Sequence, residues 1–245
     1  MIDFHAHILP DFDDGPDRME EALLLIKELM DQGVETIVST SHFYSYEEGL
    51  EDFIRRRDKA FDSLKEATQD LEINLVKGAE VYCSETLLLM TDFSEISIEG
   101  TPVILLELPE KKPLSSQLVK IIQKLTNRHS LIPLIAHAER YPELIRMSTS
   151  GIKKLKKMGC LIQVNTSSIL SKSKYHKVAL KMLDRGLVDI IGTDSHGTSF
   201  RRPSMYDARQ ELVRLYGQDF FDQLMDNARN LIMQKSRDSL SDMWT

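Results

Sequence analysis

The strongest constraint on the fold is a regular alternation of short apolar runs with longer amphipathic stretches. Short apolar or β-branched runs predict strands at residues 1–4, 36–39, 73–76, 102–106, 131–136, 161–164 and 188–191. Apolar residues at helical spacing predict helices at residues 19–30, 50–67, 118–125, 152–157, 178–183, 204–216 and 219–234, the first with Asp17 as its N-cap. Strands that alternate with helices form βαβ units, so the sequence predicts an α/β fold with a parallel sheet.

About seven such units account for nearly all of the 245 residues. Single α/β barrels have about 250 residues, so a single seven-unit TIM-like barrel is the fold that we expect. No Pro/Ser-rich linker or internal repeat divides the sequence. We therefore expect one catalytic domain over residues 1–245, with the last ten polar residues frayed.

Composition excludes several classes of protein. The chain has 31 Lys+Arg against 38 Asp+Glu, a formal net charge of −7, which argues against nucleic-acid binding. No apolar run reaches the ~18 residues of a membrane span, and the N-terminus lacks a signal peptide. Cys83 and Cys160 form no CxxC pair, and neither lies in a phosphate-cradling CxxxxxR loop. We expect a cytoplasmic protein, which a partner could recruit to the inner face of the membrane.

Potential metal ligands follow the predicted strands at six separate places. In a parallel barrel, these positions lie at the carboxyl ends of the strands, where barrel enzymes carry their active sites. The residues are His5, His7, His42, Glu80, Glu107, His137, Asp194 and His196.

Two of these places contain a pair of ligands at alternate positions. In extended chain, His5 and His7 point the same way and can hold one metal, and Asp194 with His196 repeats this pattern. An isolated histidine is more often a hydrogen-bonded surface or core residue, and we interpret His129 and His176 in that way. Five of the seven histidines lie at the ends of predicted strands, and this clustering favours metal binding.

The loop after His7 adds another candidate, Asp14, for which an Asx turn is the alternative. Five histidines with several carboxylates exceed the needs of one four-coordinate zinc ion. Two or three divalent metals, bridged by a carboxylate such as Glu80, would use them, and this ligand set suits Mn, Fe or Zn. Such metal clusters serve phosphate-ester hydrolysis.

Arginines lie beside two of the predicted ligands. Arg140 follows His137 by three residues, and Arg201 and Arg202 follow His196. Guanidinium groups bind phosphate oxygens in bidentate fashion. The alternative for these arginines is an ordinary surface salt bridge.

Several short motifs carry a family resemblance. They are MIDFHAHILP (1–10), DDGP (13–16), TIVSTSH (36–42), GAE (78–80), PLIAHAERY (133–141) and GTDSH (192–196). With them, the chain resembles the polymerase-and-histidinol-phosphatase (PHP) superfamily. Within it, the chain is most similar to bacterial tyrosine-protein phosphatases encoded with capsule and exopolysaccharide genes. The resemblance extends from residue 1 to about residue 230.

The resemblance implies a distorted (β/α)7 barrel with a trinuclear, often manganese-supported centre. Its matching ligands are His5, His7, Asp14, His42, Glu80, Glu107, His137, Asp194 and His196. Arg140 matches the family's catalytic arginine. Arg202, before Pro203, matches a second phosphate-facing arginine, with Arg201 one residue earlier as the alternative.

The implied substrate is the phosphotyrosine tail of a cognate bacterial tyrosine kinase that regulates capsular polysaccharide synthesis. Our hypothesis for the reaction is in-line attack on phosphorus by a hydroxide that bridges the metals, with a phenolate as leaving group (pKa about 10). We expect the loops at residues 44–52 and 110–113 to select the substrate. The sequence is compatible with an oligomer.

Three alternatives remain open at this point. Another PHP phosphoesterase, such as a histidinol-phosphate phosphatase, would share the metals. A metal-dependent deoxyribonuclease or amidohydrolase also begins with HxH, although the net charge argues mildly against a nuclease. A non-enzymatic scaffold of the polysaccharide machinery could keep the barrel.

Overall fold

Parallel strands surrounded by helices make up the fold, which a computed structural model describes for residues 1–109 and 115–233. The strands are β1 Ile2–Ala6, β2 Thr36–Ser39, β3 His42–Phe43, β4 Asn74–Lys77, β5 Glu80–Tyr82, β6 Val103–Glu107, β7 Ile132–Ile135, β8 Leu161–Asn165 and β9 Ile190–Gly192. The predicted selection loop at residues 110–113 and the last ten residues lie outside the described residues.

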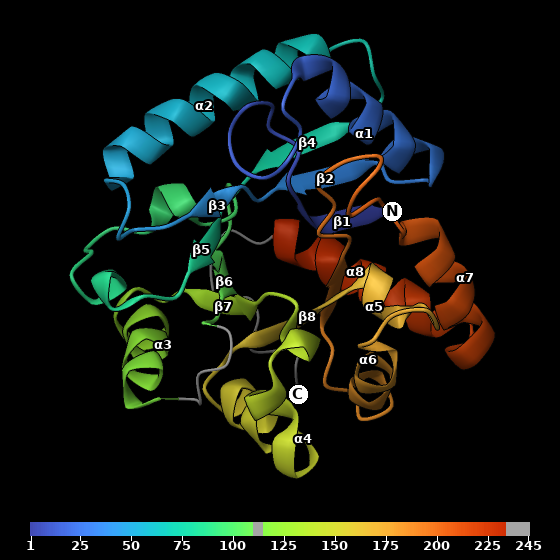
Figure 1. Cartoon of the computed structure of the whole chain (residues 1–245). Helices are drawn as coiled ribbons and strands as arrows, with labels where there is room; N and C mark the ends of the chain where they lie inside the picture. The colour runs from blue at the N-terminus through green and yellow to red at the C-terminus, as the bar shows by residue number, and fades with distance from the viewer. Residues whose placement is uncertain (110–114, 234–245) are drawn as a thin grey trace.

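Helices connect the strands and cover them from outside (Figure 1). The α-helices are α1 Met19–Asp31, α2 Leu50–Ala67, α3 Ser116–Arg128, α4 Pro142–Lys157, α5 Thr166–Ile169, α6 His176–Leu183, α7 Met205–Tyr216 and α8 Gln218–Met233. Short 3-10 helices are η1 Glu85–Leu88, η2 Ser94–Ile96 and η3 Ala138–Arg140. No helix in this described part is long and apolar enough to cross a membrane.

The strands form two sheets, in the orders β1-β2-β4 and β3-β5-β6-β7-β8-β9. Every strand pair recorded in the described residues is parallel. Parallel sheets are buried on both faces by their crossover helices, which explains why all four residues of β7, IPLI, are buried. The prediction of a parallel α/β fold is confirmed.

Backbone hydrogen bonds join the two sheets where β1 lies next to β9. The amide of Asp194 donates to the carbonyl of His5 at 2.7 Å, and the amide of His7 donates to the carbonyl of Ser195 at 2.9 Å. A Cβ at Gly192 would lie 2.7 Å from the Cβ of His5. Glycine is therefore required for this close approach, which brings the two ends of the chain's strand series together.

Helix α1 shows how the amphipathic stretches cover the strands. Its buried residues Ala22, Leu25, Ile26 and Leu29 recur at helical spacing and belong to the main hydrophobic core. The spacing that predicted the helix is therefore the spacing that packs it. A second cluster of buried residues includes Phe4 of β1, Leu105 of β6 and Leu231 of α8.

Two local predictions differ from the structure, and two short strands were not predicted. The N-cap of α1 is Arg18, not Asp17, and the Glu21 carboxylate accepts a hydrogen bond from the Asp17 amide instead. Helix α4 begins at Pro142, ten residues before the predicted start, because Ser148–Gly151 hides its periodicity while proline is favourable in a first turn. Strands β3 and β5 are too short to give a sequence signal.

Candidate metal centre

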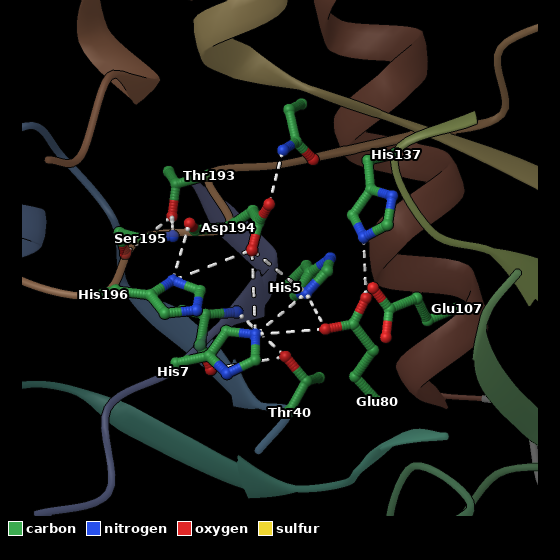
Figure 2. Close-up of polar contacts among 12 residues, drawn as sticks. His5, His7, Thr40, Glu80, Glu107, His137, Thr193, Asp194, Ser195 and His196 are labelled. Atoms are coloured by element: carbon green, nitrogen blue, oxygen red, sulfur yellow. Dashed lines mark hydrogen bonds and ion pairs between the residues drawn. The ribbon is translucent and has the colours of Figure 1, made fainter. Parts of the chain in front are cut away.

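Nine side chains with metal-binding atoms converge where the strands end. His5 lies on β1 and His7 just after it, while His42 begins β3 and Glu80 begins β5. Glu107 ends β6, and the other four follow strand ends or lie in loops. Figure 2 shows the imidazoles of His5, His7 and His196 close together, with Glu80 between them and His137.

The ligand atoms form three groups, each with all its atoms within 4.8 Å of one another. The first group is His7, Asp14, His42 and His196; the second is His5, His7, Glu80 and Asp194; the third is Glu80, Glu107 and His137. The structure thus brings together all nine residues that the sequence singled out. His7 belongs to two groups, and so does Glu80, so the three groups are contiguous.

The first group is organised around one oxygen of Asp14. Its Oδ1 lies 3.0 Å from Nε2 of His196 and 3.4 Å from Nε2 of His42. The rings of His7 and His196 stack with centroids 3.8 Å apart. Asp14 is 56% exposed, whereas the imidazoles are mostly covered, so this group opens to solvent on its carboxylate side.

Glu80 connects the second and third groups through its two oxygens. Oε2 lies 3.2 Å from Nε2 of both His5 and His7, while Oε1 lies 2.9 Å from Nε2 of His137. Asp194 Oδ1 completes the second group at 3.5 Å from His5 Nε2. The Glu80 carboxylate is therefore placed as a bridging ligand would be, at full burial.

Unpartnered buried atoms test whether these residues fit metal ions. Within the described residues, six buried side-chain atoms lack a hydrogen bond of acceptable geometry; Ser39 Oγ, Ser41 Oγ and Glu139 Oε2 lie outside the ligand groups, and the other three are Glu80 Oε2, His42 Nδ1 and His196 Nε2. Leaving buried polar atoms unsatisfied costs about 1–3 kcal/mol each. The latter three belong to residues of the ligand groups, and mixed imidazole and carboxylate donors suit a divalent cation. The residues present fit such ions.

The pKa values of the ligand residues reflect the close packing of opposite charges in these groups. Burial lowers the pKa of His7, but the carboxylates of Asp13 and Glu80 outweigh this and raise it to about 10. Burial and the neighbouring His7 lower the pKa of His196 to about 4. Although burial opposes it, His5 and His137 hold the pKa of Asp194 below its usual range. Since a metal binds neutral imidazole, cation binding must release protons from this cluster.

Asp13 is a supporting residue whose role the sequence did not reveal. Its Oδ2 lies 2.9 Å from Nδ1 of His7 and accepts a hydrogen bond from the His42 amide at 3.0 Å. A carboxylate on Nδ1 directs Nε2 of the same ring toward the metal position. The sequence signal was present, because Asp13 adjoins Asp14 in the loop after His7.

The strand ends themselves are braced by hydroxyl groups. Thr40 Oγ1 accepts from the amide of Ala6 at 3.1 Å and donates to its carbonyl at 3.3 Å, which fixes the segment between His5 and His7.

Two of the ligand residues have an unusual backbone conformation. His137 and Asp194 have positive φ angles of 31° and 52°, which are uncommon for residues other than glycine. Such backbone strain is typical of functional sites.

Two of the three predicted arginines reach the cluster. Arg140 Nη2 lies 2.9 Å from Asp194 Oδ2, while Arg201 pairs with Asp194 and, at 3.2 Å, with Asp14. The structure does not bring Arg202 there. Its guanidinium is 62% exposed and pairs with Glu28 of α1 at 2.8 Å, outside the ligand groups, and Arg201 beside it has a positive φ of 49°.

The other two histidines stay outside the cluster. His176 Nδ1 lies 2.7 Å from the Ile169 carbonyl, and His129 packs edge-on against Phe93. Neither belongs to a metal-ligand group among the residues described by the structure.

A mostly apolar pocket adjoins the third group. Tyr141 forms part of its wall, and the Tyr141 hydroxyl also lies 3.1 Å from Nδ1 of His137. Tyr46, Tyr82, Leu118 and other residues complete the lining. Tyr141 therefore contacts both the pocket and a residue of the candidate metal centre.

Comparison with known proteins places this geometry in a family. Tyrosine-protein phosphatase CpsB of Streptococcus pneumoniae is 34% identical over 254 residues, covering 96% of this chain and 99% of that protein. CpsB of Streptococcus agalactiae serotype III is 32% identical over 247 residues, covering 95% and 98%. The structural match described as YwqE from Bacillus subtilis and CpsB from S. pneumoniae, unique metal-dependent tyrosine phosphatases, has a TM-score of 0.81. It covers 97% of this chain and 98% of that one at 24% identity, which shows the shared fold.

A family model also matches most of the chain. It is described as "Capsular polysaccharide synthesis, CpsB/CapC" and matches residues 1–233. This agrees with the resemblance carried by the histidine motifs, and confirms it. The chain belongs to the CpsB/CapC family of capsular polysaccharide synthesis proteins.

Proposed function

We propose that this protein is a metal-dependent protein-tyrosine phosphatase that acts on a bacterial tyrosine kinase controlling capsular or exopolysaccharide synthesis. One observation carries the proposal: three contiguous ligand groups share His7 and Glu80, and two arginines reach their edge. The relatives' designation as tyrosine-protein phosphatases supports the reaction, and the family description supports the capsule context.

The three ligand groups would hold two or three divalent cations, for which manganese is our first choice and iron or zinc the alternatives. Bound divalent cations lower the pKa of water and neutralise charge on a phosphate ester. Within this chain, Glu80 would hold two neighbouring sites together, and Asp13 would keep His7 oriented. The buried imidazoles exclude bulk water from the inner side.

The arginines would bind the phosphate group. Arg140 and Arg201 each present a guanidinium to Asp194, at the edge of the second group. A guanidinium fork can bind two phosphate oxygens and stabilise charge that develops on them. The tyrosine oxygen can leave as a phenolate, with a pKa of about 10, so that a strong general acid is unnecessary.

The apolar pocket beside Tyr141 favours a peptide substrate over a small metabolite. Its walls supply aromatic and aliphatic surface beside Tyr141, which could contact residues that flank a phosphotyrosine. A kinase tail as substrate is supported by the family description, and this substrate would place the enzyme in the cytoplasm. We propose no role for nucleic acid or for membrane insertion.

Two structural expectations belong to this proposal. Residues 1–245 would form one catalytic domain, in keeping with a family match over residues 1–233. If β2 with β3, and β4 with β5, are each regarded as one interrupted strand, the parallel strands correspond to a distorted (β/α)7 barrel.

Metal analysis combined with substrate comparison tests the proposal. Purified protein would be assayed on a phosphotyrosine peptide and on histidinol phosphate, with and without added Mn²⁺, and with His5→Ala and His137→Ala variants checked for folding. We expect peptide turnover that depends on metal and is lost in both variants. Preferred turnover of histidinol phosphate would assign a different phosphoesterase, and chelator-insensitive turnover would overturn the metal mechanism.

A further inference from the structure

Strand β8 differs from its neighbours because, within the described part of the chain, none of the nine ligand residues lies on it or directly follows its end. It nevertheless lies between β7, which leads to His137, and β9, which leads to Asp194. Gln163 and Asn165 alternate with Val164 on β8, so their side chains share one face of the strand. Both are fully buried.

These two amides form a continuous chain of hydrogen bonds between three ligand residues. Gln163 Oε1 accepts from the His137 amide at 2.5 Å and lies 3.4 Å from Nδ1 of His5. Gln163 Nε2 donates to Asn165 Oδ1 at 2.8 Å, and Asn165 Nδ2 donates to Asp194 Oδ2 at 2.6 Å.

The donor-to-acceptor direction of this series of hydrogen bonds is determined at both of its ends. A backbone N–H can only donate, so the Gln163 atom that faces His137 must be its oxygen. A carboxylate can only accept, so the Asn165 atom that faces Asp194 must be its nitrogen. Reversal of either amide would therefore place two donors or two acceptors opposite each other.

This direction has a consequence for each ligand. With an acceptor beside Nδ1, neutral His5 carries its proton on Nδ1, which leaves the lone pair of Nε2 facing Glu80 and Asp194. With a donor on Oδ2, Asp194 presents Oδ1 to the second ligand group, where Arg201 also contacts that oxygen. Gln163 also satisfies the amide of His137, whose φ of 31° is unfavourable for a residue with a side chain.

We propose that Gln163 and Asn165 are positioning residues, an amide relay on β8 that presents His5, His137 and Asp194 to the metal ions. This inference rests on the proposed metal centre and adds to it the residues that orient its ligands. Hydrogen-bond partners of metal ligands typically contribute 10–100-fold in metal affinity. The relay should therefore act on metal binding before it acts on any substrate.

The test measures the binding of Mn²⁺ alone, by calorimetry and by metal content, in Gln163→Met and Asn165→Ala proteins. We expect each variant to bind Mn²⁺ at least about tenfold more weakly than the wild type. Because the two residues act through one chain, the double variant should lose little more than the weaker-binding single variant.

The matched control is Asn227→Ala. Asn227 is another buried amide, which donates to the Asp189 carbonyl at 3.0 Å without touching a ligand. Its removal should lower thermal stability to a similar extent, yet leave the affinity for Mn²⁺ unchanged. A purely structural role for the relay would make all three variants alike in both measurements.

The outcomes separate this inference from the proposed function. If the wild type binds no Mn²⁺, Zn²⁺ or Fe²⁺, the metal centre itself is refuted. If the wild type binds Mn²⁺ and both relay variants bind it within about twofold as tightly, the relay is refuted while the centre stands. If both variants fail to fold without metal while Asn227→Ala folds, the amides determine folding and the proposal is overturned.

Discussion

Replacement of Arg201 and of Arg202, one at a time by alanine, is the sharpest test of the proposed phosphate site. These neighbours have the same chemistry, but the structure gives them different surroundings. Arg201 is 25% exposed and contacts Asp14 and Asp194, whereas Arg202 is 62% exposed and contacts Glu28. The sequence resemblance placed either of them at the phosphate, with Arg202 matching the motif.

The expected magnitudes follow from these contacts. Loss of one positioned donor to a developing oxyanion costs about 2.7–4 kcal/mol, or a 10²–10³-fold fall in turnover. We expect a loss of that size in kcat/KM for Arg201→Ala. An exposed ion pair such as that of Arg202 contributes about 0–1 kcal/mol to stability, so Arg202→Ala should keep its turnover within about twofold.

The assay is release of phosphate from a phosphotyrosine peptide at saturating Mn²⁺, with metal content measured for each protein. Metal content matters because Arg201 contacts two candidate ligands, and its loss could change cation binding. Arg201→Lys keeps the charge but loses the planar fork, so we expect an intermediate rate. Equal losses in the two alanine variants, or an Arg201→Ala rate within threefold of the wild type at equal metal content, would refute the reasoning.

Three further predictions concern metal, charge and thiol chemistry. Removal of metal with a chelator should abolish peptide turnover and lower the melting temperature, and Mn²⁺ should restore both; turnover that survives complete removal contradicts the proposal. Lys156→Met should lower the free energy of unfolding by about 2 kcal/mol in denaturant titrations, since it removes the ammonium 2.7 Å from buried Asp189. Burial raises the pKa of Asp189 above its unfolded value. Lys156 opposes this rise, so its removal raises the pKa of native Asp189 further. The native variant therefore keeps its proton to a higher pH than the native wild type, and the deficit should grow as the pH rises above the unfolded pKa of Asp189; a deficit that shrinks would contradict this. Burial also raises the pKa of the Cys83 thiol to about 12, so a thiol reagent at pH 8 should leave Cys83 unmodified in the folded protein, and rapid labelling would contradict its burial.

The ligand set was visible in the sequence because of how parallel strands work. A ligand directly after a strand must lie at the carboxyl edge of the sheet, whatever the exact packing of the helices. His5 and His7 were recognisable from alternation alone, since residues two apart in extended chain share a face, and they do share the second ligand group. The same reasoning was wrong for Asp194 and His196, which lie in different ligand groups, with Asp194 at a positive φ of 52°. The alternating pattern likewise predicted most helices to within a few residues, because the spacing of apolar residues is the spacing of the buried face.

Tertiary structure alone decided which residues support that set. Gln163 is an unremarkable polar residue in the strand predicted at residues 161–164, and Asn165 directly follows that prediction. Only the packing of β8 between β7 and β9 gives them ligand partners. The choice between Arg201 and Arg202 depends on their partners in the fold, Asp14 and Asp194 for Arg201 and Glu28 for Arg202, which no local pattern encodes. The sequence determined the kinds of atoms at the end of each strand through local periodicity. Their distances, hydrogen-bond partners and charges depend on contacts between segments as much as 190 residues apart, such as that of Asp3 with Thr193, and these exist only in the folded chain.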